Sequence, residues 1–359
     1  MVLLDKVNQI RGLFEEFGID GLLVTNEQNR RYLTDFTGSA GLVLITENDA
    51  LFLTDFRYGE QAHAQITGYE INIHPSSRGV MDSIAHNVSK LGITNLGFEA
   101  GDMNFNMYTQ IKNAIAENLV PTTKIVERLR LVKNEVEIEK IRKAAVIGDA
   151  AFTHIQSMIR PGVTELEVAI ELEHFMKKQG ASGNSSHSLI VASGRRGALP
   201  HGVASDKVIE QGDMVTLDYG ALYEGYRSDM TRTLAVGEPD AKLVEIYTVV
   251  NDALQLTLDT IKAGMAANEI DAIARDYIDG KGYGQYFGHG LGHGIGLDIH
   301  EEPFFAKSNT DKLLPGMIVT IEPGIYIPEL GGVRIEDDIL VKENEVEILT
   351  LSPKQLIRL

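Results

Sequence analysis

In the first third of the chain, short apolar runs alternate with segments whose apolar residues recur every three or four positions. Val7, Ile10, Phe14 and Phe17 have the spacing of a helix that ends at Gly18. The other elements expected here are strands at 21–24, 41–45, 50–53 and 96–98 and a helix at 80–91. Strands that alternate with helices predict a small α/β layer.

The pattern changes near residues 124–133, where the alternation of strands and helices ends. Asn134 is then placed to cap a long helix whose apolar stripe runs from Ile138 to Ile159. We therefore expect two domains, a smaller one at 1–127 and a larger one at 128–359.

The larger domain contains an internal repeat of two helices followed by two strands, and its two copies are offset by 102 residues. The second helix of each copy ends near a glycine, Gly180 or Gly282. Capping boxes are expected where these helices begin, formed by Thr164 with Glu167 and, more loosely, by Asn268 with Asp271. The region is predicted to be an α+β domain with helices on one face of a curved, mostly antiparallel sheet.

Each copy continues into a strand that carries an acid. Residues 215–220 read VTLDYG, residues 319–324 read VTIEPG, and a second acid follows each copy on the next expected strand. The four acids are Asp218, Asp229, Glu322 and Glu336. One such acid alone would usually face solvent, but two pairs in register across a repeat indicate a shared site, whose buried charges need compensation. Two divalent cations would balance them, and oxygen ligands favour Mn²⁺, Mg²⁺ or Co²⁺ over a structural zinc site.

Histidines cluster in and after the glycine-rich segment 288–296, just before the second acidic strand. Their spacing fits neither an HExxH zinc helix nor a GxGxxG phosphate loop, so the glycines are expected to let the backbone approach a ligand closely. A lone buried histidine is usually a satisfied core residue. Here we expect one of His289, His293 and His300 to ligate metal and the others to bind substrate or move protons. His201 precedes the first acidic strand as His300 precedes the second, and is a further candidate.

Arg334 stands two positions before Glu336, so on a strand both side chains would point into one acidic cavity. Its guanidinium would either bind a substrate carboxylate through two hydrogen bonds or neutralise Asp338. Together these parts suggest metal-assisted hydrolysis. The ions would activate a water, a carboxylate would carry a proton to the leaving nitrogen, and a histidine would hydrogen-bond the developing oxyanion.

The composition narrows the class of protein further. A chain of 359 residues with 43% hydrophobic content can bury a core in each domain. The absence of cysteine excludes disulfides and thiolate metal sites, and a net charge of −18 argues against nucleic-acid binding. Apolar stretches are too short to span a bilayer and no signal peptide is visible, so we expect a cytoplasmic protein without a membrane partner.

Several segments resemble the creatinase/aminopeptidase P/prolidase family, the pita-bread metallopeptidases. They read VTLDYG, GYRSDMTRT, GHGLGHGIGLDIHE, TIEPG and RIEDD. Residues 29–39 and 54–58 are similar to that family's N-terminal domain. The resemblance spans the chain and implies a C-terminal α+β pita-bread (creatinase-like) domain with an internal two-fold repeat, together with a smaller α/β N-terminal domain.

Carried over residue by residue, the resemblance implies a dinuclear centre in which Asp229 and Glu336 bridge the metals. The implied metal ligands are Asp218, Asp229, His293, Glu322 and Glu336. The implied catalytic residues are His201, His289, His300 and Glu322, and the implied substrate-binding residues are His201, His289, His300 and Arg334. Two divalent ions are implied, with Mn²⁺ expected and Co²⁺ or Zn²⁺ as alternatives. The implied substrates are short proline-containing peptides, and the implied assembly is a homodimer.

Within this family the expected activity is that of an Xaa-Pro dipeptidase (prolidase), and an Xaa-Pro aminopeptidase acting on longer peptides stays open as the alternative. The additional N-terminal domain argues against a methionine aminopeptidase. The retained ligand positions argue against metal-free creatinase and against a non-enzymatic binding module. Family members often carry Ser-Phe-Asp where this chain has Ser186-His187-Ser188, which leaves the preference for the Xaa side chain open.

Overall fold

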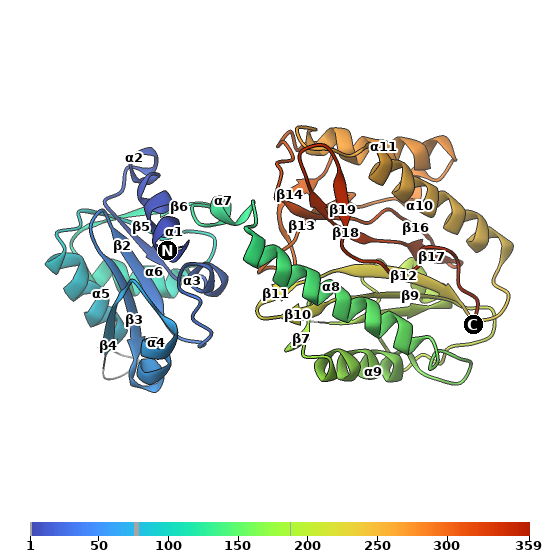
Figure 1. The fold of residues 1–359 in the computed structure, drawn as a ribbon, viewed down its shortest axis with the longest axis horizontal. Coiled ribbons are helices and arrows are strands. Elements are labelled where there is room, and N and C mark those ends of the chain that lie inside the picture. Colours follow the sequence, from blue (N-terminus) through green and yellow to red (C-terminus); the bar gives the residue numbers. More distant parts are fainter. Residues whose placement is uncertain (1, 75–78, 187) are drawn as a thin grey trace. The chain divides into compact units, whose positions relative to one another are not determined.

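A computed structural model describes residues 2–74, 79–186 and 188–359 (Figure 1). It divides into two compact units, Met1–Arg130 and Leu131–Leu359. The boundary expected between residues 127 and 128 falls inside helix α7 (Glu127–Arg130), and the division follows the end of that helix. Among the described residues, no helix combines the length and the apolar character that crossing a bilayer demands.

The first unit is built on a six-stranded mixed sheet with the strand order β4-β3-β2-β1-β5-β6. Its strands are β1 (Gly21–Val24), β2 (Leu42–Thr46), β3 (Ala50–Asp55), β4 (Glu70–His74), β5 (Asn95–Glu99) and β6 (Asn118–Thr122). Its helices before α7 are α1 (Val2–Arg11), α2 (Phe14–Phe17), α3 (Glu27–Thr34), α4 (Gly59–Gln65), α5 (Gly79–Lys90) and α6 (Phe105–Ala114). The single helix expected to end at Gly18 is interrupted at Gly12, where the lack of a side chain weakens the helix, and Gly18 closes only its second part with φ 64°.

The second unit contains four long helices and short antiparallel strands. The helices are α8 (Glu135–Ile155), α9 (Glu165–Lys178), α10 (Ala241–Thr260) and α11 (Ala267–Gly280). The strands are β7 (Gly183–Asn184), β8 (Ile190–Ser193), β9 (Met214–Tyr219), β10 (Ala221–Tyr223), β11 (Tyr226–Arg227), β12 (Met230–Ala235), β13 (Gly292–Gly294), β14 (Glu301–Phe305), β15 (Ile318–Ile321), β16 (Gly324–Ile327), β17 (Gly331–Arg334), β18 (Asp337–Val341) and β19 (Val346–Ile348). The strands lie between the helix pair α8 and α9 and the helix pair α10 and α11 (Figure 1).

Each helix pair forms a core with its own strands. Apolar residues of α8 and α9 pack with those of β8, β9 and β12, which form one sheet. Apolar residues of α10 and α11 pack with β15 and β18, the centre of a five-stranded sheet with the order β14-β13-β15-β18-β19. The internal repeat of the sequence therefore corresponds to two similar helix-and-sheet halves.

Of the two capping boxes predicted at the second helix of each copy, one is present and one is not. Thr164 and Glu167 form the expected capping box at α9. The counterpart expected from Asn268 and Asp271 is wrong, because α11 begins at Ala267 and its N-cap is Ala266. Only half of a box remains there: the carboxylate of Glu269 accepts a hydrogen bond from the Ala266 backbone at 2.9 Å, and alanine has no oxygen to return it.

The four acids take equivalent places in the two halves. Asp218 lies at the end of β9 and Glu322 directly follows β15. Asp229 directly precedes β12, which pairs with β9, and Glu336 directly precedes β18, which pairs with β15. The pairing of neighbouring strands therefore brings each pair of acids to one end of its sheet.

Candidate active site

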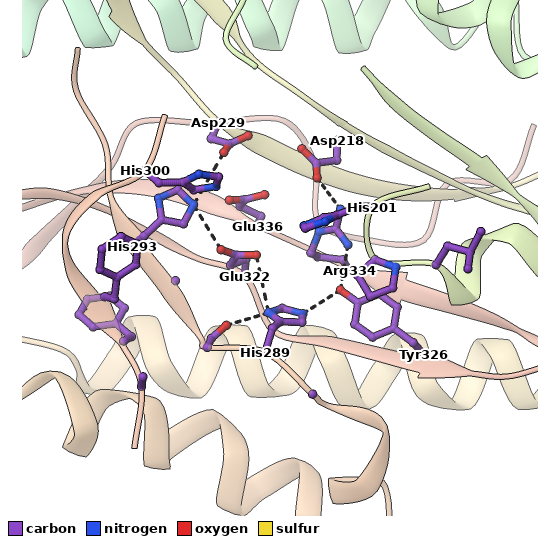
Figure 2. Close-up of a pocket in the computed structure, with 18 of the residues that line it drawn as sticks. His201, Asp218, Asp229, His289, His293, His300, Glu322, Tyr326, Arg334 and Glu336 are labelled. Atoms are coloured by element: carbon purple, nitrogen blue, oxygen red, sulfur yellow. Dashed lines mark hydrogen bonds and ion pairs between the residues drawn. The ribbon is translucent and has the colours of Figure 1, made fainter. Parts of the chain in front are cut away.

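One cavity of about 1140 Å³ in the second unit contains every site residue that the sequence predicted (Figure 2). These residues are His201, Asp218, Asp229, His289, His293, His300, Glu322, Arg334 and Glu336. They come from both halves of the repeat, so the site is formed where the halves meet.

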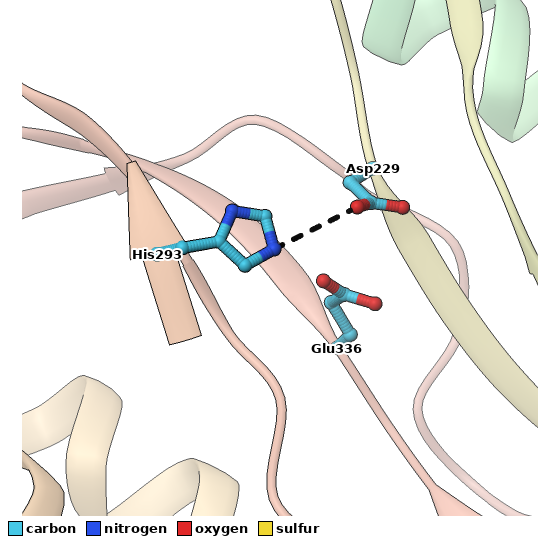
Figure 3. A group of neighbouring side chains, drawn as sticks. All are labelled: Asp229, His293 and Glu336. Carbon is cyan, nitrogen blue, oxygen red and sulfur yellow. Dashed lines mark ion pairs between the residues drawn. The ribbon is translucent and has the colours of Figure 1, made fainter. Parts of the chain in front are cut away.

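Three buried side chains of the cavity form a group that could hold a metal ion: Asp229, His293 and Glu336, of which Glu336 is only 2% exposed. Each offers a ligand atom, and these atoms lie within 4.8 Å of one another (Figure 3). Ligands bound at about 2.0–2.2 Å on opposite sides of an ion are separated by about 4–4.4 Å. Nε2 of His293 lies 4.0 Å from Oδ2 of Asp229, so the spacing of these two atoms suits a divalent cation. Glu322 extends the cluster, with its Oε1 atom 3.4 Å from Nε2 of His293.

The imidazole of His293 is oriented as a metal ligand would be. Its Nδ1 lies 3.0 Å from the carbonyl oxygen of Gly294 and donates to it. This bond leaves the lone pair of Nε2 facing the carboxylates. Burial, followed by the charge of His300, lowers the pKa of His293 to about 4, which keeps the ring neutral.

The glycines next to His293 serve the packing of the strands, and Gly288, Gly290 and Gly292 also line the cavity, where the backbone was expected to approach a ligand. A Cβ on Gly292 would lie 2.0 Å from the carbonyl oxygen of Thr320. A Cβ on Gly294 would lie 2.2 Å from the carbonyl oxygen of Glu302. Since β13 lies between β14 and β15, only glycine lets the backbones come this close around the histidine.

The acids of the site carry strongly perturbed pKa values. Burial, reinforced by the charge of Glu336, raises the pKa of Asp229 and of Glu322 well above the ordinary range. Burial and the charge of Asp218 raise the pKa of Glu336 to about 7. Carboxylates that resist ionisation in this way are those that a bound cation would stabilise as anions.

Arg334 contributes a positive charge to the cavity and is 3% exposed. Its guanidinium forms an ion pair with Asp218, donates to the Tyr326 hydroxyl at 2.8 Å and donates to Oγ1 of Thr231 at 3.1 Å. The alternative that Arg334 neutralises Asp338 is wrong. Asp338 instead accepts a hydrogen bond at 2.8 Å from the backbone of Asp229.

Three of the predicted histidines differ in their surroundings. His289 donates through Nδ1 to the carbonyl oxygen of Gly290 at 2.8 Å, and its Nε2 accepts from the Tyr326 hydroxyl at 2.9 Å. Burial, followed by the charge of Arg334, lowers the pKa of His289 to about 4. The rings of His201 and His300 line the cavity without a hydrogen-bond partner among the residues that the structure describes, so both are available to a ligand.

Sequence reasoning missed two residues that organise the site. Tyr326 bonds both His289 and Arg334, and Thr231 donates to Glu336 at 2.6 Å while accepting from Arg334. The sequence could have indicated Thr231, because it stands two positions after Asp229 at the start of β12. Side chains two positions apart on a strand point to the same face. Tyr326 had none, since its position depends on the pairing of β16 with β17. His187, where the chain departs from the family pattern, lies outside the described residues.

Two family models match the chain. Residues 139–343 match the model of metallopeptidase family M24, and residues 6–132 match that of the creatinase/prolidase N-terminal domain. These matches confirm the predicted family and the predicted fold class, a pita-bread domain with a smaller N-terminal domain.

Known proteins are similar over nearly the whole chain. An Xaa-Pro dipeptidase from Bacillus anthracis has a similar structure, with a TM-score of 0.97, 55% identity and coverage of 99% of this chain and 100% of that one. An Xaa-Pro dipeptidase of Pyrococcus horikoshii is 39% identical over 99% of each chain. The structure of an X-Pro aminopeptidase from Thermotoga maritima matches with a TM-score of 0.88 and 39% identity, covering 96% of this chain and 99% of that one.

Proposed function

This chain belongs to metallopeptidase family M24, and from that premise we propose that it is an Xaa-Pro dipeptidase dependent on two divalent metal ions. The proposed ligands are Asp218, Asp229, His293, Glu322 and Glu336. The observation that carries the proposal is the buried group of Asp229, His293 and Glu336, whose ligand atoms lie within 4.8 Å of one another. We expect Mn²⁺, because carboxylate oxygens dominate the set and no sulfur is available.

The charges of the cavity support two ions. Four carboxylates would carry four negative charges, of which the Arg334 guanidinium offsets one next to Asp218. Divalent cations at such a site supply Lewis acidity, which activates water and polarises a peptide carbonyl. With ions present, the raised pKa values of Asp229 and Glu336 would fall, and both groups would be held as anions.

We assign the chain's own residues the following parts in catalysis. Glu322 lies beside His293 at the edge of the proposed metal group, so it is placed to take a proton from water and deliver it to the leaving nitrogen. His201 and His300 have free ring nitrogens at the cavity wall and would bind the substrate and its developing oxyanion. Both ring nitrogens of His289 already form hydrogen bonds, one to Gly290 and one to Tyr326. His289 would therefore bind substrate only by exchanging one of these bonds.

A second candidate function, Xaa-Pro aminopeptidase, is favoured by one observation. A dipeptidase must recognise the free carboxylate that follows proline, and Arg334 is the one lysine or arginine among the described residues lining the cavity. Its Nε, Nη1 and Nη2 atoms already donate to Thr231, Tyr326 and Asp218. Arg334 is therefore better placed to support the metal ligand Asp218 than to bind a substrate carboxylate.

The test compares two substrates on metal-stripped protein reloaded with Mn²⁺ or Co²⁺. A dipeptidase hydrolyses Gly-Pro with a kcat/KM well above that for Gly-Pro-Gly, and an aminopeptidase does the reverse. Hydrolysis of neither peptide, with two ions bound, would contradict both functions. As a control, Gly-Ala and Gly-Ala-Gly should be poor substrates, because the proposal concerns the bond to proline.

We also propose that the protein acts in the cytoplasm as a homodimer. The absence of cysteine is compatible with a reducing compartment, and the dimer rests on the resemblance to its family. Size-exclusion chromatography with light scattering should give a mass near twice the 39.4 kDa of one chain.

A further inference from the structure

His289 is carried by a segment that has little regular structure to hold it. Residues 287–291 lie between a short 3-10 turn and β13, and the flanking residues Gly288 and Gly290 have no side chains to pack. The imidazole nevertheless has a defined place in the cavity, where it bonds Tyr326 and lies with Nδ1 3.9 Å from Oε2 of Glu322 (Figure 2). Something outside the segment must fix its backbone.

The fixing group is an ion pair on helix α11. Asp271 is 1% exposed, and its two carboxylate oxygens each accept a hydrogen bond of 2.7 Å from Arg275, one turn later on the helix. The same carboxylate accepts from the backbone of Leu291 at 3.1 Å. The pair is therefore joined directly to the end of the segment that carries His289.

The guanidinium of Arg275 reaches the rest of the segment. Nη2 donates to the backbone carbonyl of His289 at 2.7 Å, and Nη1 donates to that of Phe287 at 3.0 Å. The guanidinium carbon also lies 4.4 Å from the centre of the Phe287 ring. That ring in turn meets the imidazole of His289 edge to face at 5.1 Å.

We infer that Arg275, held in place by Asp271, is a positioning residue for His289. Arg275 touches no residue of the metal group; it acts on the cavity through the backbone at positions 287 and 289 and through the Phe287 ring. The effect that we expect on catalysis rests on the proposed function. The effect that we expect on the position of His289 rests on the geometry alone.

Arginine suits this task for a geometric reason. Its planar guanidinium presents several N–H donors in fixed directions, so it can bind both oxygens of Asp271 and two carbonyl oxygens together. Lysine would keep the charge opposite Asp271 but offers one nitrogen, which cannot span these acceptors. Arg275→Lys therefore removes the positioning while preserving the ion pair.

The first experiment observes His289 directly. Protein labelled with ¹⁵N-histidine is compared by NMR for the wild type and Arg275→Lys, with the His289 signals assigned through His289→Gln. The expected result is a shifted or broadened pair of His289 nitrogen signals and unchanged signals from His293. Unchanged His289 signals in a folded Arg275→Lys protein would overturn the inference.

The matched control is Arg142→Lys. Arg142 also binds a carboxylate through two nitrogens, to Glu347 at 3.0 and 2.9 Å, but on α8 and away from the cavity. The Arg142→Lys substitution should leave the NMR signals of the histidines and the activity unchanged. If Arg142→Lys moved the His289 signals as much as Arg275→Lys does, the effect would be a general loss of structure and the inference would be wrong.

The second experiment is a double-mutant cycle on Gly-Pro hydrolysis, at two bound metal ions per chain. Arg275→Lys should lower kcat about tenfold. On a His289→Ala background the same change should lower it less than twofold, because there is no longer an imidazole to position. Equal losses in both backgrounds would contradict positioning. A wild-type protein inactive on Gly-Pro would overturn the proposed function alone, since the NMR comparison still decides the role of Arg275.

Discussion

The two halves of the larger unit share a backbone plan and differ in their chemistry. Each half supplies two acids from a pair of antiparallel strands, β9 with β12 and β15 with β18. The imidazoles that lie within 4.0 Å of these acids, His289 and His293, and the guanidinium that pairs with Asp218, Arg334, all come from the second half. The repeat therefore sets where the negative charges lie, and residues outside the repeated pattern decide what balances them.

The balance is made across the halves. Arg334 of the second half pairs with Asp218 of the first. Thr231 of the first half donates to Glu336 of the second at 2.6 Å, and the backbone of Asp229 donates to Asp338 of the second at 2.8 Å. Neither half could hold the site alone, and a metal ligated by both would join them further.

The largest effect is expected at Asp229, an acid of the first half whose backbone donates to Asp338 of the second. Asp229→Asn should lower kcat on Gly-Pro by on the order of a thousandfold, because it removes the charge proposed to bridge two ions. Metal analysis should find fewer than two ions per chain. His201→Asn, in the same half, should keep both ions and lose activity through substrate binding. If His201→Asn lost metal while Asp229→Asn kept two ions, the two roles would be reversed.

Removing the guanidinium that links the halves should have the next largest effect. Arg334→Ala leaves Asp218 without its partner, and a charged hydrogen bond of this kind is worth about 2–3 kcal/mol. We therefore expect kcat/KM to fall roughly ten- to a hundredfold, equally on Gly-Pro and Gly-Pro-Gly. A rise in KM for Gly-Pro alone would instead mean that Arg334 binds the substrate carboxylate, as one of the two sequence hypotheses held.

A pH experiment on metal-free protein tests the ionisation of Glu336, an acid of the second half. The folded-state pKa of Glu336 is raised to about 7 from an ordinary value of 4.5, so its contribution to stability is fully present below pH 4.5 and is lost as pH rises through 7. Relative to Glu336→Gln, the wild type should lose on the order of 2–3 kcal/mol of unfolding free energy across this range.

The glutamine variant serves as the comparison, since it cannot ionise at this position. The difference between the two proteins reports Glu336 together with Asp229 and Glu322, whose pKa values its charge raises. Denaturant unfolding at pH 4.5, 6 and 8 measures both proteins. A difference between them that stays constant with pH would show that Glu336 ionises freely in the fold, contrary to its burial. Added Mn²⁺ should abolish the dependence in the wild type.

The smallest effect is expected at the N-caps of α9 and α11, where the two halves of the repeat can be compared residue by residue. Ala266 has φ −80° and ψ 147°, close to the −85° and 154° of Thr164, but it lacks the oxygen that completes the capping box. Ala266→Thr should therefore stabilise the protein by about 0.5–1 kcal/mol, and Thr164→Ala should destabilise it by about 1 kcal/mol. Thermal unfolding of metal-loaded protein checks both. A destabilising Ala266→Thr would show that the halves differ in more than this oxygen.

How far the sequence predicts the site depends on how local each feature is. The four acids were found because a repeat and a short spacing mark them, and strand pairing then brings each pair together. The spacing of the histidines left three candidates for the metal ligand, and His293 was singled out only by the resemblance to the family. The cap of α11 was misplaced by two residues because Asn268 is the better capping residue in isolation. The offset of the repeat, which puts Ala266 opposite Thr164, was the more reliable guide.

Contacts between strands were beyond the reach of the sequence. One of the two hypotheses for Arg334 paired it with Asp338, which is near in the chain, but its partner is Asp218, which belongs to the other half. Tyr326 was missed for the same reason, since it meets Arg334 only through the pairing of β16 with β17. Register between distant strands is set by the packing of the whole domain, which no local pattern encodes.

The most direct test of the account is a titration of exhaustively metal-free protein with Mn²⁺, following Gly-Pro hydrolysis and the melting temperature together. The account predicts no turnover and a lowered Tm at the start, because the buried acids repel one another without compensation. Both quantities should then rise and saturate at two ions per chain. Full turnover in the metal-free protein, or a Tm that does not change as the ions bind, would contradict the central claim that Asp229, His293 and Glu336 belong to a metal centre.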